Sequence, residues 1–477
     1  MTDRPLPKKN DELELTIHDM AFGGVGISKL QTEKGDFILF VQNTIPGQIV
    51  KARVTKAKKT FAECRLESII CPSPEEVPIP YQSIPGAPYA TLPIDRQIEL
   101  KRKTALELYR RIGKIEDIET RLDEMIISPG TWHYRNKMEY SFSAIRFDLE
   151  KQEVVDDFAL GFKHRGTWWM VENLDRDSGL FDSKLETSLS NIRKWCEKTG
   201  LPAYHPPGRH GFFRFLVARK SYFSDELLIN LVTSEEGLDK FDTTAFVNLM
   251  KGILGSRLAG LFHTINNDTG DRVSPLQGSS KLLCGTPKIV EVLNGLEFEI
   301  SMESFFQTNP RCAEKLYDKV VEYAGENSDK EKYIFDLFCG TGTIAQLLAK
   351  GTKEKVVGVD IEESAIEDAK RNARRNKIRN VEFHAADVGK FLLKYPHYRD
   401  RISTIILDPP RAGIAPKSLD KVLALGAARI VYVSCNPATQ ARDAEILMKA
   451  GYQLKKISLA DQFPHTSHIE AIALFEK

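Results

Sequence analysis

Two short apolar runs that end in reactive side chains most constrain the fold of this chain. The run from Thr404 to Leu407 ends at Asp408, and the run from Ile430 to Val433 ends just before Cys435. Each has the length of a buried strand. In open α/β sheets, ligands bind at the carboxyl ends of the strands. We therefore expect Asp408 and Cys435 to lie together at that edge, on neighbouring strands.

A glycine turn upstream of these runs indicates a nucleoside site. The strand from Tyr333 to Leu337 leads into Phe338-Cys339-Gly340-Thr341-Gly342-Thr343, and a helix follows from Ile344 to Lys350. Glycines allow close approach of the backbone to a ligand. The strand from Val356 to Val359 ends in Asp360, whose carboxylate can bind ribose hydroxyls. Asp387, after the strand from Val381 to Ala385, is a candidate for the adenine edge.

The glycine turn fits both a dinucleotide and S-adenosylmethionine. After Gly342 the chain continues Thr343-Ile344-Ala345, without the third glycine of the dinucleotide fingerprint. Because alanine can replace that glycine, the difference favours S-adenosylmethionine only modestly.

Residues 10–72 predict a small β-barrel. Short alternating apolar pieces are separated by turn residues such as Gly23-Gly24 and Pro46-Gly47. The segment from Lys51 to Arg65 carries six cations and Phe61 against one acid, Glu63. Such a segment suits an RNA backbone with a stacked base. A solvated hairpin is the alternative.

A connector and a mixed α/β region follow the barrel. The 23 residues from Cys71 to Pro93 hold seven prolines, and Asp95 to Ile118 predicts an amphipathic helix. Lys163-His164-Arg165 and Trp168-Trp169 combine cations with aromatic rings, as single-stranded RNA recognition requires. The alternative is core tryptophans beside a basic turn. Strand-like pieces lie at 140–145, 159–162, 216–218, 227–232 and 256–266.

Composition narrows the class of protein. The 477 residues are 42% hydrophobic and 28% charged, as in soluble globular proteins, and can bury about two to four domain cores. The net charge of +1 requires any RNA contact to come from local basic clusters. No run approaches ~18 apolar residues and no secretory signal is evident, so we expect a cytoplasmic protein without a membrane partner. The seven scattered cysteines predict reduced thiols.

Three carboxyl-terminal motifs together resemble the RNA uracil-5-methyltransferase family, which methylates carbon 5 of uridine in ribosomal or transfer RNA. They are DPPR from Asp408, SCNP from Ser434 and FPHTSHIE from Phe463, in the family's order. The run from Ser304 to Asn309 and the run from Tyr134 to Glu139 are similar to further signatures of the family. The amino-terminal region resembles the family's accessory RNA-binding barrel, of the TRAM type.

The resemblance implies S-adenosyl-L-methionine as the cofactor and gives roles to single residues. Cys435 is the implied nucleophile and Glu470 the implied proton acceptor. The predicted cofactor contacts, which combine the glycine turn with those that the resemblance adds, are Gln307, Phe338, Gly340, Gly342, Thr343, Asp360, Asp387 and Asp408.

These roles match the chemistry. Carbon 5 of uracil is a poor nucleophile, and addition of a thiolate at carbon 6 creates an enolate whose carbon 5 can accept a methyl group. A general base must then remove the carbon 5 proton. The alternatives are a structural cysteine at Cys435, a surface acid at Glu470 and a metal pair formed by His465 and His468. We expect no metal, and neutral hydrogen-bonding roles for both histidines.

The resemblance also predicts where this chain departs from many relatives. Family members often carry a Cys-x5-Cys-Gly-Gly-Cys run after the barrel, which binds an iron-sulfur cluster. No cysteine lies between Cys71 and Cys196. Because such clusters need thiolate ligands, we predict a member without an iron-sulfur cluster.

We therefore predict an α/β protein of three domains: an OB-like, TRAM-type barrel (1–72), a connector, helix and mixed α+β RNA-contacting domain (73–292), and a doubly wound, Rossmann-like catalytic domain (293–477). The predicted function is methylation of carbon 5 of a specific uridine in RNA. The predicted substrate is 23S ribosomal RNA, with transfer RNA as the alternative and no obligate protein partner implied. A non-catalytic RNA-binding scaffold and an amino-group methyltransferase, which needs no thiol, are the competing hypotheses.

Overall fold

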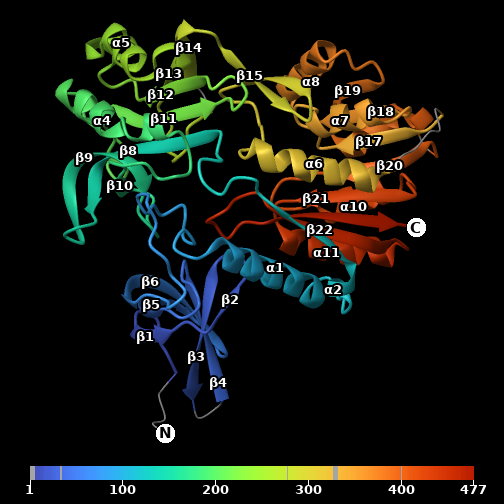
Figure 1. Ribbon diagram of the computed structural model, residues 1–477, viewed down its shortest axis with the longest axis horizontal. Coiled ribbons are helices and arrows are strands. Elements are labelled where there is room, and N and C mark those ends of the chain that lie inside the picture. The colour runs from blue at the N-terminus through green and yellow to red at the C-terminus, as the bar shows by residue number, and fades with distance from the viewer. Residues whose placement is uncertain (1–5, 33–34, 277, 326–330, 399) are drawn as a thin grey trace.

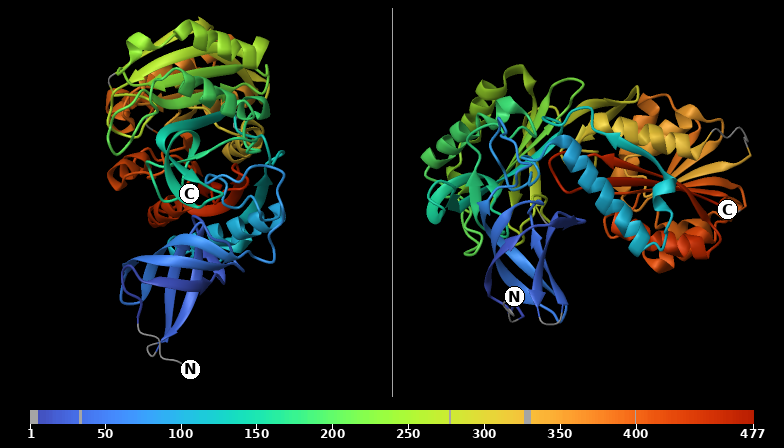
Figure 2. Two further views of the ribbon diagram at one scale, coloured as in Figure 1. Left: turned by 90° about the vertical axis from the view of Figure 1, so that its left-hand side faces the viewer. Right: turned by 60° about the horizontal axis from the view of Figure 1, so that its bottom comes forward.

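Three sheets organise the chain into three bodies. The computed structural model describes residues 6–32, 35–276, 278–325, 331–398 and 400–477. The first sheet forms a separate lobe below the other two bodies, and the last body contains the carboxyl terminus (Figures 1 and 2).

The amino-terminal lobe is a curled sheet of six strands in the order β1-β5-β6-β4-β3-β2. Side chains that alternate along the strands, such as Leu39, Val41, Val50, Ala52 and Val54, fill its core. The predicted barrel is confirmed. Its strands are β1 (Glu12–Thr16), β2 (Asp19–Ala21), β3 (Val25–Thr32), β4 (Gly35–Gln42), β5 (Ile49–Ala57) and β6 (Phe61–Cys71).

The central body is a seven-stranded mixed sheet in the order β10-β9-β8-β11-β12-β13-β14. Helices α3 (Ser183–Glu186), α4 (Leu189–Lys198) and α5 (Thr243–Leu254) accompany it. The strands are β8 (Lys137–Asp148), β9 (Glu153–Lys163), β10 (Val171–Asn173), β11 (Phe213–Lys220), β12 (Leu227–Thr233), β13 (Leu258–Asn266) and β14 (Gly278–Gly285). Four of the five strand-like pieces predicted for this region fall within these strands. The fifth, 256–266, begins two residues too early, because a 3-10 turn (Gly255–Arg257) precedes β13.

A two-stranded ribbon, β15 (Lys288–Leu293) and β16 (Leu296–Ser301), leads from the central body to an eight-stranded sheet in the order β19-β18-β17-β20-β21-β23-β22-β7. Its first five strands are parallel, and β23 is antiparallel to both neighbours. The strands are β7 (Leu122–Ile127), β17 (Tyr333–Leu337), β18 (Lys355–Asp360), β19 (Val381–Ala385), β20 (Ile402–Leu407), β21 (Arg429–Ser434), β22 (Gln453–Asp461) and β23 (Glu470–Glu476).

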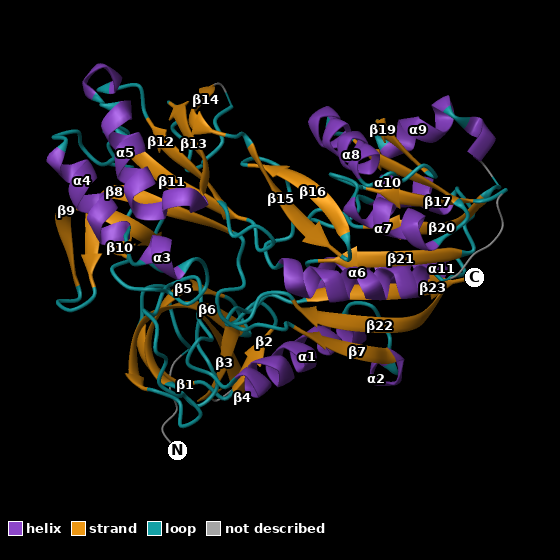
Figure 3. Ribbon diagram, turned by 45° about the horizontal axis from the view of Figure 1, so that its top comes forward, coloured by secondary structure: helices purple, strands orange, loops and turns teal. Residues whose placement is uncertain are grey.

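Helices cover both faces of this sheet (Figure 3). Successive residues of a strand enter opposite cores: Ile405 packs with one set of helices and Ile406 with the other. The doubly wound fold that the sequence predicts is confirmed. The helices are α6 (Pro310–Ala324), α7 (Thr343–Gly351) and α8 (Glu363–Arg375) on one face, and α1 (Ile94–Arg111), α9 (Val388–Lys394), α10 (Pro416–Leu423) and α11 (Pro437–Lys449) on the other.

Helix α1 differs from the predicted helix in its end point. The predicted helix continues to Ile118, whereas α1 ends at Arg111 and a short helix, α2 (Ile118–Arg121), follows. Gly113 follows this end and lets the chain pass close to its neighbours, because a Cβ atom there would lie 2.8 Å from the carbonyl oxygen of Tyr109 and 3.3 Å from that of Ala441 on α11. The chain then turns back and adds β7 to the edge of the sheet, beside β22.

Within the described part of the chain, no helix is both long and apolar enough to cross a membrane.

Candidate active site

The carboxyl ends of β20 and β21 bring Asp408 and Cys435 to one edge of the sheet. The two strands are parallel neighbours, and Leu407, the residue before Asp408, pairs with Tyr432. The turn after β21 is fixed locally: Ser434 Oγ accepts a hydrogen bond from the Asn436 amide at 3.1 Å, and Asn436 caps helix α11. Cys435 is half-buried, whereas Cys312 and Cys339 of the same sheet region are buried.

Strand β23 places Glu470 beside Cys435. The antiparallel pairing of β21 with β23 matches Ser434 with Ala471, so the next position outward matches Cys435 with Glu470. Glu470 is the first residue of β23, and its side chain is buried, with 4% of its surface exposed. The structure therefore brings together the thiol and the acid that the sequence motifs single out.

The three acidic groups of this edge share an electrostatic environment. Burial raises the pKa of Asp408 to about 7, and burial together with the charge of Asp408 raises the pKa of Glu470 to about 8. Burial and the charges of both carboxylates raise the pKa of the Cys435 thiol to about 11. The guanidinium of Arg411 opposes the shift of Glu470 and that of Cys435.

Arg411 is held beside this edge by both motifs. Its carbonyl oxygen accepts a hydrogen bond from Asn436 Nδ2 at 3.1 Å, and its Nη2 donates to His468 Nδ1 at 2.8 Å. Because a guanidinium can only donate, His468 accepts, which requires a neutral imidazole. Sequence reasoning quoted Arg411 within DPPR but gave it no role.

The glycine turn after β17 lies at the same edge of the sheet. Gly340 donates its amide hydrogen to Asp360 Oδ2 at 2.9 Å, which ties the turn to the end of β18. Phe338, Gly340 and Gly342 all have φ in the left-handed region, at 69°, 52° and 74°. A Cβ atom on Gly340 would meet nothing within 4 Å, so open space lies beside this turn. Thr343 is buried and begins helix α7.

These residues fit S-adenosylmethionine. The open space at Gly340 admits a ligand against the backbone, and the Asp360 carboxylate is the group that binds ribose hydroxyls in nucleoside sites. Two large apolar side chains that neighbour predicted contacts in the sequence are strongly exposed: Ile361, directly after Asp360, at 68% and Phe305, two residues before Gln307, at 70%. Sequence reasoning missed both. The signal for Ile361 is an apolar residue directly after the acid that ends a strand.

Two further predicted cofactor contacts, Asp387 and Gln307, make hydrogen bonds within the protein. Asp387 follows β19, and its Oδ1 accepts a hydrogen bond from the Lys390 amide at 3.1 Å, so it caps helix α9. Gln307 is buried, and its Oε1 accepts a hydrogen bond from Gln462 Nε2 at 3.3 Å. This contact places Gln307 beside the loop that precedes Glu470 rather than in the glycine turn.

The two histidines of that loop have structural partners. His465 is buried, stacks on Trp132 with ring centroids 3.7 Å apart, and has a pKa lowered to about 4 by burial and by the charge of Lys101. Among the residues that the structure describes, no three His, Cys, Asp or Glu side chains are grouped to hold a metal ion.

Comparison with known proteins decides the family. A sequence model of the family described as tRNA (Uracil-5-)-methyltransferase matches residues 288–477, and a model of the TRAM domain matches residues 8–66. The chain is 36% identical to an uncharacterized RNA methyltransferase of Clostridium acetobutylicum, with 99% of each chain covered. The chain belongs to the RNA uracil-5-methyltransferase family. A similar protein of Caldanaerobacter subterraneus is also 36% identical and covers 98% of this chain and 99% of its own.

A solved structure agrees with this membership of the RNA uracil-5-methyltransferase family. The tRNA (uracil-54, C5)-methyltransferase of Pyrococcus abyssi, in complex with S-adenosyl-L-homocysteine, is 27% identical and has a TM-score of 0.70. The match covers 97% of this chain and 100% of the other. The protein is therefore an S-adenosylmethionine-dependent RNA (uracil-5-)-methyltransferase with a TRAM domain, which confirms the family and the enzyme class that the motifs predict.

Proposed function

We propose that this enzyme methylates carbon 5 of one specific uridine through a covalent adduct between Cys435 and carbon 6 of the uracil. The observation that carries the proposal is the register of β21 and β23, which sets Cys435 opposite the buried Glu470. A scaffold needs neither group, and an amino-group methyltransferase needs no thiol.

The steps assign a task to each side chain. The Cys435 thiolate forms a bond to carbon 6, and the electron pair of the carbon 5–carbon 6 double bond moves into the ring as an enolate. S-adenosylmethionine supplies the methyl group, and Gln307, the turn from Phe338 to Thr343, Asp360 and Asp408 would hold it, with Asp387 as a further candidate. The Glu470 carboxylate then takes the carbon 5 proton, the double bond forms again, and the thiolate leaves.

The electrostatics suit this division of roles. Cys435 must lose a proton although its pKa lies near 11, and the Arg411 guanidinium stabilises the thiolate. Glu470, with a pKa of about 8, is close to the value that suits a general base at neutral pH. Asp408 and Glu470 repel one another when both are charged, which favours transfer of a proton to Glu470.

The RNA path follows a cleft between the barrel and the central body. The cleft has a volume of about 910 Å³ and is lined by Phe61 and Arg65 of the barrel and by His164 and Arg165 of the central body. Two basic segments about a hundred residues apart, which the sequence singles out separately, thus meet at one surface. Gly166 lies against Arg65, since a Cβ atom there would be 3.4 Å from the Arg65 Cδ.

Arg165 is the cation of this cleft that is best placed for a phosphate. It has no hydrogen bond or ion pair with another residue of the described ranges, and its neighbour Glu172 is bound by His164 at 2.5 Å. By contrast, the β5 cations Lys51, Arg53 and Lys56 pair with acids of the same lobe. Part of the basic segment of the barrel is therefore a solvated hairpin, and the RNA contact moves to its edge at Phe61 and Arg65.

The remaining assignments are proposals from the sequence. The chain divides into a barrel (1–72), a connector, helix and RNA-contacting region (73–292) and a catalytic domain (293–477), and no iron-sulfur cluster is bound. Of the second region, α1 and β7 pack with the catalytic sheet. The proposed substrate is 23S ribosomal RNA, on the strength of the barrel. Transfer RNA is the second candidate, favoured by the likeness to the Pyrococcus abyssi enzyme over 97% of this chain.

One experiment tests the reaction and the substrate together. Purified protein is incubated with labelled S-adenosylmethionine and, separately, with ribosomal RNA and transfer RNA from cells that lack its gene. We expect 5-methyluridine in the large-subunit ribosomal RNA. The same product in transfer RNA alone would select the second candidate, and another methylated nucleoside would contradict the proposed reaction.

A further inference from the structure

The loop between β22 and β23, residues 462–469, is held by hydrogen bonds from four segments of the chain. Each of four consecutive carbonyl oxygens accepts a hydrogen bond from a different segment of the chain. The pairs are Gln462 with Asn309 Nδ2 at 3.0 Å, Phe463 with Lys101 Nζ at 2.9 Å, Pro464 with the Tyr134 hydroxyl at 2.9 Å, and His465 with the Tyr89 amide at 3.0 Å. The loop leads directly into Glu470, so its path determines where β23 starts.

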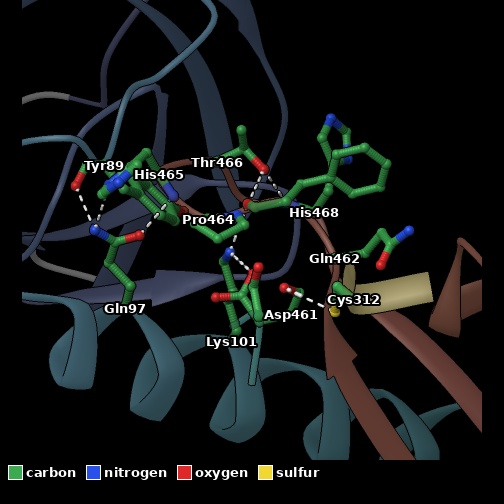
Figure 4. A network of polar contacts seen from close by, with 12 residues as sticks. Tyr89, Gln97, Lys101, Cys312, Asp461, Gln462, Pro464, His465, Thr466 and His468 are labelled. Atoms are coloured by element: carbon green, nitrogen blue, oxygen red, sulfur yellow. Dashed lines mark hydrogen bonds and ion pairs between the residues drawn. The ribbon is translucent and has the colours of Figure 1, made fainter. Parts of the chain in front are cut away.

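Helix α1 contributes two side chains that contact the loop, Gln97 and Lys101, one turn apart. Figure 4 shows both pointing from the helix to the loop. Gln97 Oε1 accepts from the His465 amide at 2.8 Å, and its Nε2 lies 3.1 Å from His465 Nδ1. Lys101 Nζ donates to Asp461 Oδ1 at 2.6 Å, in an ion pair in which both side chains are at most 2% exposed.

This arrangement does more than hold the fold together. A buried ion pair contributes little net stability, because two charges leave water, and an apolar pair of similar volume would serve the core as well. Polar groups of this kind instead restrict the geometry. His465 has a φ of 66°, which a non-glycine residue adopts only where its surroundings impose it. Asp461 ends β22 and Glu470 begins β23. The contacts of Gln97 and Lys101 with Asp461, Phe463 and His465, which we call the clamp, therefore fix the first half of the segment that leads to the proposed base.

We propose that Lys101, together with Gln97, is a positioning residue for the reaction: from helix α1 it holds the loop 462–469 so that the carboxylate of Glu470 faces the Cys435 adduct. This inference rests on the proposed function. Neither residue lies at the sheet edge that carries Cys435 and Glu470. Both belong to a helix more than 300 residues before the loop that they contact.

The proposal predicts a specific kinetic defect. Lys101→Met removes the donor to Phe463 and keeps the length of the side chain. Formation of the adduct and methyl transfer need Cys435, whereas release needs a well-placed Glu470. We expect kcat to fall on the order of 10- to 100-fold, the KM for RNA to stay unchanged, and a methylated protein–RNA complex to accumulate on a denaturing gel. Arg102→Met, at the exposed next position of α1, is the matched control and should behave as the wild type.

A second variant separates positioning from folding. Lys101→Met leaves Asp461 buried without its cation, whereas Lys101→Met with Asp461→Asn removes both charges. The double variant should melt close to the wild type and still accumulate the complex. A folded double variant with wild-type kcat would overturn the proposal. So would a variant that loses adduct formation and RNA affinity together with its thermal stability, because Lys101 would then act on the fold alone.

Glu470→Gln, measured in parallel, separates a failure of the positioning role from a failure of the proposed function. If Glu470→Gln accumulates the covalent complex and Lys101→Met does not, the positioning role fails while the proposed function stands. If Glu470→Gln turns over normally, the general base of the proposed function fails, and the positioning role fails with it.

Discussion

Cys435 and Glu470 face one another one position beyond the last pair of the antiparallel strands β21 and β23, Ser434 with Ala471. Parallel strands alone bring to this edge only groups that follow a carboxyl end, such as Asp408 and Cys435. Because β23 runs the other way, it brings the first residue of a strand to the same edge, and that residue is buried. The proposed nucleophile and the proposed base thus have separate backbone supports.

Replacement of the thiol should abolish the reaction. Cys435→Ala removes the group that adds to carbon 6, and we expect methyl incorporation to fall on the order of 1,000-fold or more. Binding of S-adenosylmethionine, measured by calorimetry, should stay unchanged, because the glycine turn follows another strand, β17. Cys71→Ala, at an exposed cysteine of the barrel, is the control. Full turnover by Cys435→Ala would exclude the covalent route and favour direct methyl transfer.

Loss of the base should stop the reaction after the methyl transfer. In Glu470→Gln the carbon 5 proton has no acceptor, so the thiolate cannot leave. We expect kcat to fall about 100- to 10,000-fold and a stable protein–RNA complex that contains the labelled methyl group. Glu476→Gln, at the other end of β23, is the matched control. A Glu470→Gln enzyme that releases methylated RNA at the normal rate would assign the proton to another group.

The pH dependence should report Glu470. Its pKa is raised to about 8, so the carboxyl is mostly protonated at pH 7 and gains its basic form as the pH rises through that value. The rate of release from the adduct should therefore increase with pH and level off above about pH 9.

Arg411 provides a check on the sign of this dependence. Its charge lowers the pKa of Glu470 and that of Cys435. In Arg411→Met both pKa values should rise, and the ascending limb of the rate profile should move to higher pH. Lys417→Met, which removes a cation from helix α10, should leave the limb in place. A limb that moves to lower pH, or a flat profile between about pH 6 and 10, would contradict the assignment.

The absence of cysteines between Cys71 and Cys196 predicts a protein without iron. Protein purified without air should contain less than stoichiometric iron and show no visible absorption band, because no thiolate lies between Cys71 and Cys196. The connector instead packs Tyr81 on Trp132, with ring centroids 4.6 Å apart. Stoichiometric iron together with the absorption band of a cluster would show that ligands from elsewhere in the chain assemble a cluster site.

The positions of Asp408 and Cys435 at the sheet edge could be predicted from the sequence, because groups that follow the carboxyl ends of buried parallel strands lie at the same edge. The strands predicted from 404–407 and 430–433 lie within β20 and β21, and Asp408 and Cys435 follow them as expected. The place of Glu470 could not be derived in this way. Its strand lies between β21 and β22, out of chain order, and only the motif resemblance pointed to it.

The contacts of Gln97 and Lys101 with the loop could not be predicted from the sequence pattern. Gln97 and Lys101 belong to a helix with many charged residues, where a polar side chain normally faces water. Both are buried because the loop lies over that side of the helix. Asp387 shows the converse: an acid after a strand suits a ligand, and in the structure it also caps α9. Contacts between distant segments decide such cases.

The cleft between the barrel and the central body should contribute one phosphate contact through Arg165. Arg165→Met should weaken RNA binding uniformly across sequences and reduce the slope of log K against log salt by about 1, because one fewer counterion is released. We expect kcat at saturating RNA to stay unchanged, since the catalytic edge is untouched. Arg209→Met, at an exposed arginine of the same body, is the control. Equal salt slopes for Arg165→Met and the wild type would place the RNA backbone on another surface. A reduced slope would place the RNA backbone in this cleft, which Arg65 of the barrel also lines.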